Sequence, residues 1–119
     1  MRDHTKLRVF AEADELALEI YRASKHFPRD ERFGLTNQLR RAAVSIPSNI
    51  VEGCSRRSES EYVRFLEIAY GSLREAEYQL SLAFRLGYLE EADHMALAKR
   101  CDRTSRMLNT LISTLAHKQ

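Results

Sequence analysis

Glu91 and His94 have the Glu-x-x-His spacing with which di-iron carboxylate bundles point two ligands at one metal. Such a centre needs a second Glu-x-x-His pair and two further inward glutamates, and the sequence contains no second pair. Cys54 and Cys101 lie far apart and belong to no CxxC motif, so neither a zinc site nor a redox motif is indicated. The sequence therefore predicts no metal site and no cofactor.

Three short polar side chains, Ser45, Ser48 and Asn49, surround Pro47. They could form a ligand site, but a structural role is favoured. Proline frees a carbonyl one turn earlier in a helix, and short polar side chains can satisfy such a group. No histidine has a nucleophile and an acid in its own segment, and the glycines match neither the P-loop nor the dinucleotide fingerprint. We therefore predict that the chain is not an enzyme.

Charge is distributed unevenly along the chain, although the formal net charge is only +2. Residues 1–35 are neutral overall, residues 36–57 carry +3, residues 58–93 carry −5, and residues 94–119 carry +4. The two basic stretches are therefore separated by an acidic one. A small net charge does not by itself indicate a nucleic-acid partner, but basic residues gathered on one helix face can do so.

Basic residues at helical spacing near the C-terminus form the most informative pattern. Lys99, Arg103 and Arg106 each follow an apolar-seam residue by two positions, about 200° round the axis, so they should face away from the core. Such a stripe suits a phosphate backbone. A solvated face, or head-to-tail assembly against the acidic stretch of a second copy, is the alternative use. The predicted nucleic-acid-binding residues are Arg40, Arg41, Arg56, Arg57, Lys99, Arg100, Arg103 and Arg106.

Four segments have the apolar periodicity of amphipathic helices, and none shows the alternation of a strand. The first should stop by Phe27 because Pro28 follows. The second starts near Thr36, a candidate N-cap, and should end at Gly53 with a kink at Pro47. The apolar positions of these two segments are Val9, Ala13, Leu16, Ala17, Ile20 and Ser24, then Leu35, Leu39, Ala42, Ala43, Ile46 and Ile50.

The third and fourth segments carry heptad seams. Ser58 and Glu61 have capping-box spacing, Gly87 is placed to stop the third helix, and Gly71 inside it suggests a closely approaching neighbouring helix. The seams are Tyr62, Leu66, Ala69, Leu73, Ala76, Leu80 and Ala83, then Leu97, Cys101, Thr104, Leu108, Leu111 and Leu115. Heptad phasing predicts an all-α, antiparallel up-and-down four-helix bundle. In that topology the second and fourth helices are diagonal, with the acidic third helix between them.

The composition sets the class of protein. With 119 residues, 44% of them apolar and 30% charged, the chain is expected to form one globular domain over residues 1–119. No apolar run approaches the roughly 20 residues that span a bilayer, and the first ten residues lack the apolar stretch of a signal peptide. We therefore expect a cytoplasmic protein without a membrane segment.

Three strings carry a family resemblance: LRVFAEADELALEIYRASKHFP (residues 7–28), QLRRAAVSIPSNIVEG (38–53) and RFLEIAYGSLREAEYQL (64–80) followed by LGYL. Over nearly its whole length the chain resembles the four-helix bundle family encoded within intervening sequences of large-subunit ribosomal RNA genes. That family also includes the accessory variability determinant of diversity-generating retroelements. Phe10 stands where a tryptophan is common in the family.

The resemblance implies a compact bundle that can assemble as a homopentamer. In the retroelement branch, it further implies a reverse transcriptase as partner and nucleic-acid binding through basic surfaces. Taken with the basic stripe, it predicts a non-enzymatic, oligomeric accessory protein that binds RNA or DNA. The alternative is a structural or protein-interaction bundle without a nucleic-acid role.

Overall fold

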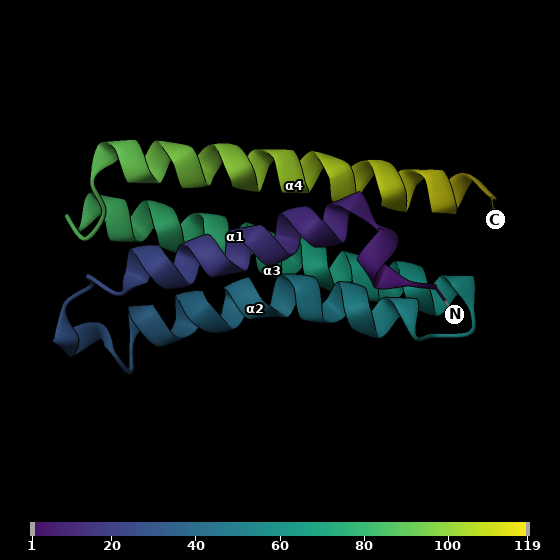
Figure 1. Ribbon diagram of the computed structural model, residues 1–119, viewed down its shortest axis with the longest axis horizontal. Helices are drawn as coiled ribbons and strands as arrows, with labels where there is room; N and C mark the ends of the chain where they lie inside the picture. Colours follow the sequence, from purple (N-terminus) through teal and green to yellow (C-terminus); the bar gives the residue numbers. More distant parts are fainter. Residues whose placement is uncertain (1, 119) are drawn as a thin grey trace.

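The computed structural model describes residues 2–118, which form four long α-helices and two short 3₁₀ helices (Figure 1). Across that range there is no strand, and no helix is long and apolar enough to cross a membrane. The bundle measures 45 × 24 × 20 Å. Its elements are η1 (His4–Lys6), α1 (Arg8–Ser24), η2 (Arg29–Glu31), α2 (Leu35–Cys54), α3 (Glu59–Arg85) and α4 (Glu91–Lys118).

The four long helices run alternately up and down, and each packs against its neighbours in sequence (Figure 1). Helix α1 also packs against α4, which closes the ring, whereas the diagonal pairs α1/α3 and α2/α4 make no such contact among residues 2–118. Both ends of the chain therefore lie at one end of the bundle. This arrangement confirms the predicted all-α four-helix bundle.

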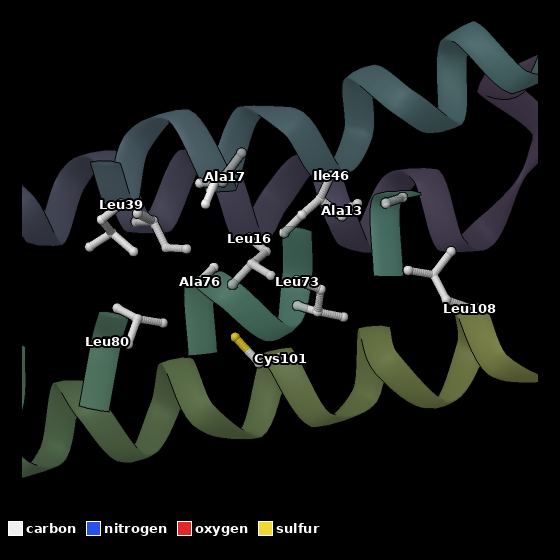
Figure 2. Close-up of a cluster of buried hydrophobic side chains, with 14 of the residues drawn as sticks. Ala13, Leu16, Ala17, Leu39, Ile46, Leu73, Ala76, Leu80, Cys101 and Leu108 are labelled. Carbon is white, nitrogen blue, oxygen red and sulfur yellow. The ribbon is translucent and has the colours of Figure 1, made fainter. Parts of the chain in front are cut away.

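The core is built from the apolar stripes that the periodicity predicted. Every position of the first three stripes is buried, and on α4 only Leu111 stays half-buried. Figure 2 shows side chains from all four helices meeting at the centre, among them Leu16, Leu39, Leu73 and Cys101. Burying a leucine or isoleucine fully stabilises the fold by about 1.5–3 kcal/mol, so these stripes account for most of the favourable free energy.

The ends of α3 were predicted correctly, but the ends of α2 were not. The Ser58 hydroxyl accepts the amide proton of Glu61 at 3.1 Å, and Gly87 takes a positive φ of 84° just after α3. Helix α2 begins at Leu35, so Thr36 lies inside the helix and is buried instead of capping it. The helix also continues past Gly53 to Cys54, because Gly53 is buried against α3 and does not turn the chain.

The helix continues through Pro47, as predicted, while the kink itself stays a prediction. The Asn49 side-chain amide donates to the Ser45 carbonyl at 2.7 Å and lies 2.9 Å from the Ser45 hydroxyl, which in turn lies 2.8 Å from the Ser72 hydroxyl. Asn49 therefore bonds the carbonyl of Ser45 instead of that of Ala43, which loses its usual donor at Pro47. These contacts support the structural role predicted for Ser45 and Asn49 and link α2 to α3.

Two buried groups make the stability of the bundle sensitive to alkaline pH. Burial raises the pKa of the Cys101 thiol from 9.0 to about 12 and that of the Tyr62 hydroxyl from 10.0 to about 12. The unfolded chain therefore loses these protons first as pH rises from 9 to 12, whereas the folded chain retains them. We expect the free energy of unfolding to fall by roughly 2–4 kcal/mol between pH 8 and pH 11.

Urea unfolding followed by circular dichroism at the two pH values measures this loss. In Cys101→Ala the loss should be smaller, because the raised pKa values of Tyr62 and of the buried Cys54 thiol still contribute but that of Cys101 does not. Equal free energies of unfolding for the wild type at pH 8 and pH 11 would contradict the expectation.

Candidate nucleic-acid interface

The outward stripe of α4 lies along the groove between α1 and α4. Lys99, Arg103 and Arg106 are exposed, as their positions two residues beyond the seam predicted, and the arginine side chains are 65% and 79% accessible. With Glu19 of α1 and neighbouring residues of α4 they line a groove of 530 Å³. The apolar seam of α4 determines this orientation, because burying Cys101, Thr104 and Leu108 forces the opposite side of the helix toward solvent.

The N-terminal segment extends the groove with two cations that sequence reasoning missed. Lys6 in η1 and Arg8 at the start of α1 line a second groove of 470 Å³, which shares Arg106 and Met107 with the first. Both basic side chains are exposed, while the next residue, Val9 of α1, is buried in the core. The sequence signal was a pair of cations just before Val9, the first position of the apolar stripe. Their position beside α4 could not be predicted, because it depends on the packing of α1 against α4.

Acidic side chains of α1 pair closely with one arginine of α4 and leave the others exposed. Arg100 lies 2.8 Å from Glu19 and 3.3 Å from Glu12, and all three side chains are less than 30% exposed. Desolvation raises the pKa of Glu19, and the nearby Arg100 guanidinium partly offsets that rise. Arg100 therefore links α4 to α1, and its charge is already paired within the protein. Arg103 approaches Glu12 only to 4.0 Å.

The more exposed cations of this surface form weaker ion pairs or none. Arg106 pairs with Asp102 at 3.1 Å, one turn earlier on the same helix, and both side chains are well exposed, so the pair contributes little to stability. Across residues 2–118, Lys6, Arg8 and Lys99 take part in no ion pair. The two grooves and Glu12 together present six basic side chains against three acidic ones.

The predicted basic residues of α2 lie elsewhere. Arg40 donates to the Ser24 hydroxyl at 2.8 Å and to the Tyr21 carbonyl at 3.2 Å, and its guanidinium lies 4.6 Å from the Tyr21 ring centroid. It therefore joins α1 to α2. Arg41 is exposed and lines a groove on the α2/α3 side of the bundle with Glu75.

At the exit of α2, Arg56 pairs with Glu52 at 3.0 Å and lies 4.9 Å from the Phe65 ring centroid, while Arg57 is exposed. The structure thus brings together the four predicted cations of α4 but separates them from Arg40 and Arg41 on α2 and from Arg56 and Arg57 in the turn after it. Only Lys99, Arg103 and Arg106 of the predicted set form one exposed stripe.

Glu91 and His94, which have the spacing of a metal-binding pair, do not lie in a metal-binding arrangement in this part of the structure. His94 stacks on Phe84 with 4.6 Å between ring centroids, while Glu91 is exposed. The part of the chain that the structure describes holds no group of three side chains suited to a metal ion. The α1/α4 groove, lined by cations beside apolar and hydroxyl side chains, is suited to electrostatic binding of a polyanion.

Comparison with known proteins identifies the family and supports the fold. Residues 5–110 match the model of a family described as 23S rRNA-intervening sequence protein. A solved structure from Bacteroides thetaiotaomicron, described as a protein with unknown function from the S23 ribosomal protein family, superposes with a TM-score of 0.82. The two chains are 25% identical over 87% of this chain and 97% of that one. No curated protein matches the sequence.

Proposed function

Because this chain belongs to the 23S rRNA-intervening sequence protein family, we propose that it is a non-enzymatic accessory protein that binds nucleic acid along the α1/α4 groove. The family name associates it with ribosomal RNA, so RNA is the ligand we expect, and DNA serves as the comparison. The single observation that supports the proposal is the row of exposed cations, made of Lys6, Arg8, Lys99, Arg103 and Arg106.

The form of this surface favours phosphate contacts over recognition of base edges. The cations lie on η1, α1 and α4 along an open groove, and among the described residues only Arg103 and Arg106 contact an acidic side chain, each through an exposed guanidinium. Each lysine or arginine that neutralises a phosphate releases condensed counterions, which supplies affinity independent of sequence. We therefore expect binding that weakens steeply as salt concentration rises.

Fluorescence anisotropy with labelled RNA and DNA across a salt series tests the proposal. Changing Lys99, Arg103 and Arg106 together to glutamine should lower the slope of log K against log salt by about 2–3, close to one for each lost contact. The three side chains are exposed, so the melting temperature should hardly change.

A matched variant removes the same charge from the opposite side of the bundle. Arg41, Arg64 and Arg85 are exposed on α2 and α3, and their joint change to glutamine should leave the slope nearly unaltered. Absence of binding by the wild type at low salt would refute the proposal. Equal losses in both triple variants would instead indicate a response to net charge without a defined surface.

Self-association is the second function, and an apolar groove between α1 and α2 favours it. The groove measures 440 Å³, and its lining includes Leu18, Tyr21, Val44 and Val51, which are 36–45% exposed. We propose that copies of the chain assemble into an oligomer, with the pentamer of the resembled family as the expected stoichiometry and a reverse transcriptase as a further candidate partner. Light scattering on the anisotropy samples measures the mass directly, and a monomer at all concentrations would contradict this assignment.

A further inference from the structure

The connector between α1 and α2 holds a phenylalanine in solvent. Phe33 is 84% exposed, more than any other large apolar side chain in the part of the chain that the structure describes. Single exposed apolar residues are common and need no explanation by themselves. The informative observation is the way in which the surrounding connector fixes the position of this ring.

Both carboxylate oxygens of Glu31 accept hydrogen bonds that hold the connector in place. One carboxylate oxygen accepts the Leu35 amide proton at 3.1 Å, and the other accepts the Tyr88 hydroxyl proton at 2.8 Å. These two hydrogen bonds hold the pKa of Glu31 below its ordinary value. Tyr88 also packs against Phe27 with 5.6 Å between ring centroids, so the connector is held against the turn between α3 and α4. The backbone on either side of Phe33 is thus held in place, and the exposed ring is preorganised.

One basic side chain contacts the exposed ring, and two more lie on the same connector. The Arg32 guanidinium lies 5.1 Å from the Phe33 ring centroid, and Lys25 and Arg29 are exposed on the same connector. Across residues 2–118 none of these three cations forms an ion pair. An exposed aromatic ring beside free cations is the combination with which proteins bind single-stranded nucleic acid, since a base stacks on the ring while the cations contact phosphates.

The connector lies at the end of the bundle where α4 begins (Figure 1). Lys99 is eight residues into α4, about 12 Å along the axis from the helix start, and Tyr88 lies in the turn just before that start. A further groove of 310 Å³, lined by Arg22, His26 and Asp93 among others, shares Glu19 and Ala96 with the α1/α4 groove and leads toward the connector. One nucleic-acid strand could therefore follow the cations of α4 and reach Phe33.

We propose that Phe33 and Arg32 form a stacking platform for an unpaired nucleobase of a single-stranded RNA whose phosphates lie along the α1/α4 groove. This inference rests on the proposed function and specifies its ligand as a single strand or an unpaired loop or end. In a duplex the base faces are occupied by neighbouring bases, so the ring has no face to stack on.

Alanine, leucine and tyrosine at position 33 separate stacking from simple apolar contact. With an unstructured single-stranded RNA, Phe33→Ala should weaken binding about 5- to 100-fold at constant salt slope, and Phe33→Leu should weaken it almost as much. Phe33→Tyr should keep the wild-type affinity. With a duplex of the same sequence all four proteins should bind equally. Tyr78→Ala, which removes another exposed aromatic ring next to an arginine on α3, is the matched control and should have no effect.

A tryptophan at the same position gives a direct signal, because the chain contains none. Emission from Phe33→Trp should be quenched by single-stranded RNA and not by the duplex. Wild-type affinity in Phe33→Ala would overturn the platform while leaving the proposed function intact. Wild-type affinity in Phe33→Leu would show that position 33 makes an apolar contact without stacking, and would also overturn the platform. A wild type that binds no nucleic acid would refute the proposed function itself, and the platform with it.

Discussion

Reversing the charge of Lys6 and Arg8 is expected to weaken RNA binding about 10- to 100-fold at low salt, although neither residue belongs to α4. The reason is the closure of the bundle, which places η1 and the first turn of α1 beside Arg106 in one groove. In the proposed binding mode, Lys6→Glu/Arg8→Glu removes two phosphate contacts and adds repulsion at the end of the cation row. The first turn of α1 contains no acidic residue, so a glutamate there also suits the positive end of the helix dipole and should not unfold the helix.

The matched control is Arg41→Glu/Arg64→Glu, which makes the same change in net charge on the α2/α3 side. Both side chains are exposed and neither belongs to an ion pair among the described residues. Anisotropy at one low salt concentration should show a large loss for the first variant and a small one for the second. A larger loss for the control would move the interface to the face that includes Arg41 and would disprove the α1/α4 surface.

The helices and the core could be predicted because they depend on local periodicity. Apolar residues at three- and four-residue steps must share one helix face, so spacing alone indicated the buried stripes of α1 to α3, although not the burial of Thr36, Cys54 and Gln79. The Ser58 cap and the Gly87 stop also depend only on neighbouring residues. Gly53 shows the limit of this reasoning, since a glycine suited to end a helix instead lies inside one where α3 passes close by.

The candidate site could be predicted only in part, because it depends on which helices are neighbours. The outward direction of Lys99 and Arg103 followed from the α4 seam, whereas the inward use of Arg100 required two glutamates on α1. Arg40 likewise turned toward Tyr21, a contact that spans two helices. Lys6 was missed for the same reason. Charge counts along a chain identify cations, but tertiary packing decides which of them remain free.

Gly53→Val is expected to lower the free energy of unfolding by about 2–4 kcal/mol, because the site has no room for a side chain. A Cβ atom at this position would lie 3.0 Å from the Cβ of Phe65, 3.1 Å from the Tyr62 ring and 3.3 Å from the Tyr62 carbonyl oxygen. The Tyr62 ring is fully buried, and the carbonyl belongs to the backbone of α3, so neither can move aside cheaply. Urea unfolding at neutral pH measures the loss.

Gly71 supplies the contrast on the next helix. The sequence suggested that a neighbouring helix approaches closely there, but a Cβ atom at Gly71 would meet nothing within 4 Å, so that prediction is wrong for the single chain. Gly71→Val should therefore change the free energy of unfolding by no more than a few tenths of a kcal/mol, because the low helix propensity of glycine is replaced by the only slightly better propensity of β-branched valine. Equal losses at the two positions would show that glycine itself, and not the α2/α3 contact, determines the effect. A wild-type oligomer that dissociates only in Gly71→Val, seen by light scattering, would place the close approach between copies of the chain.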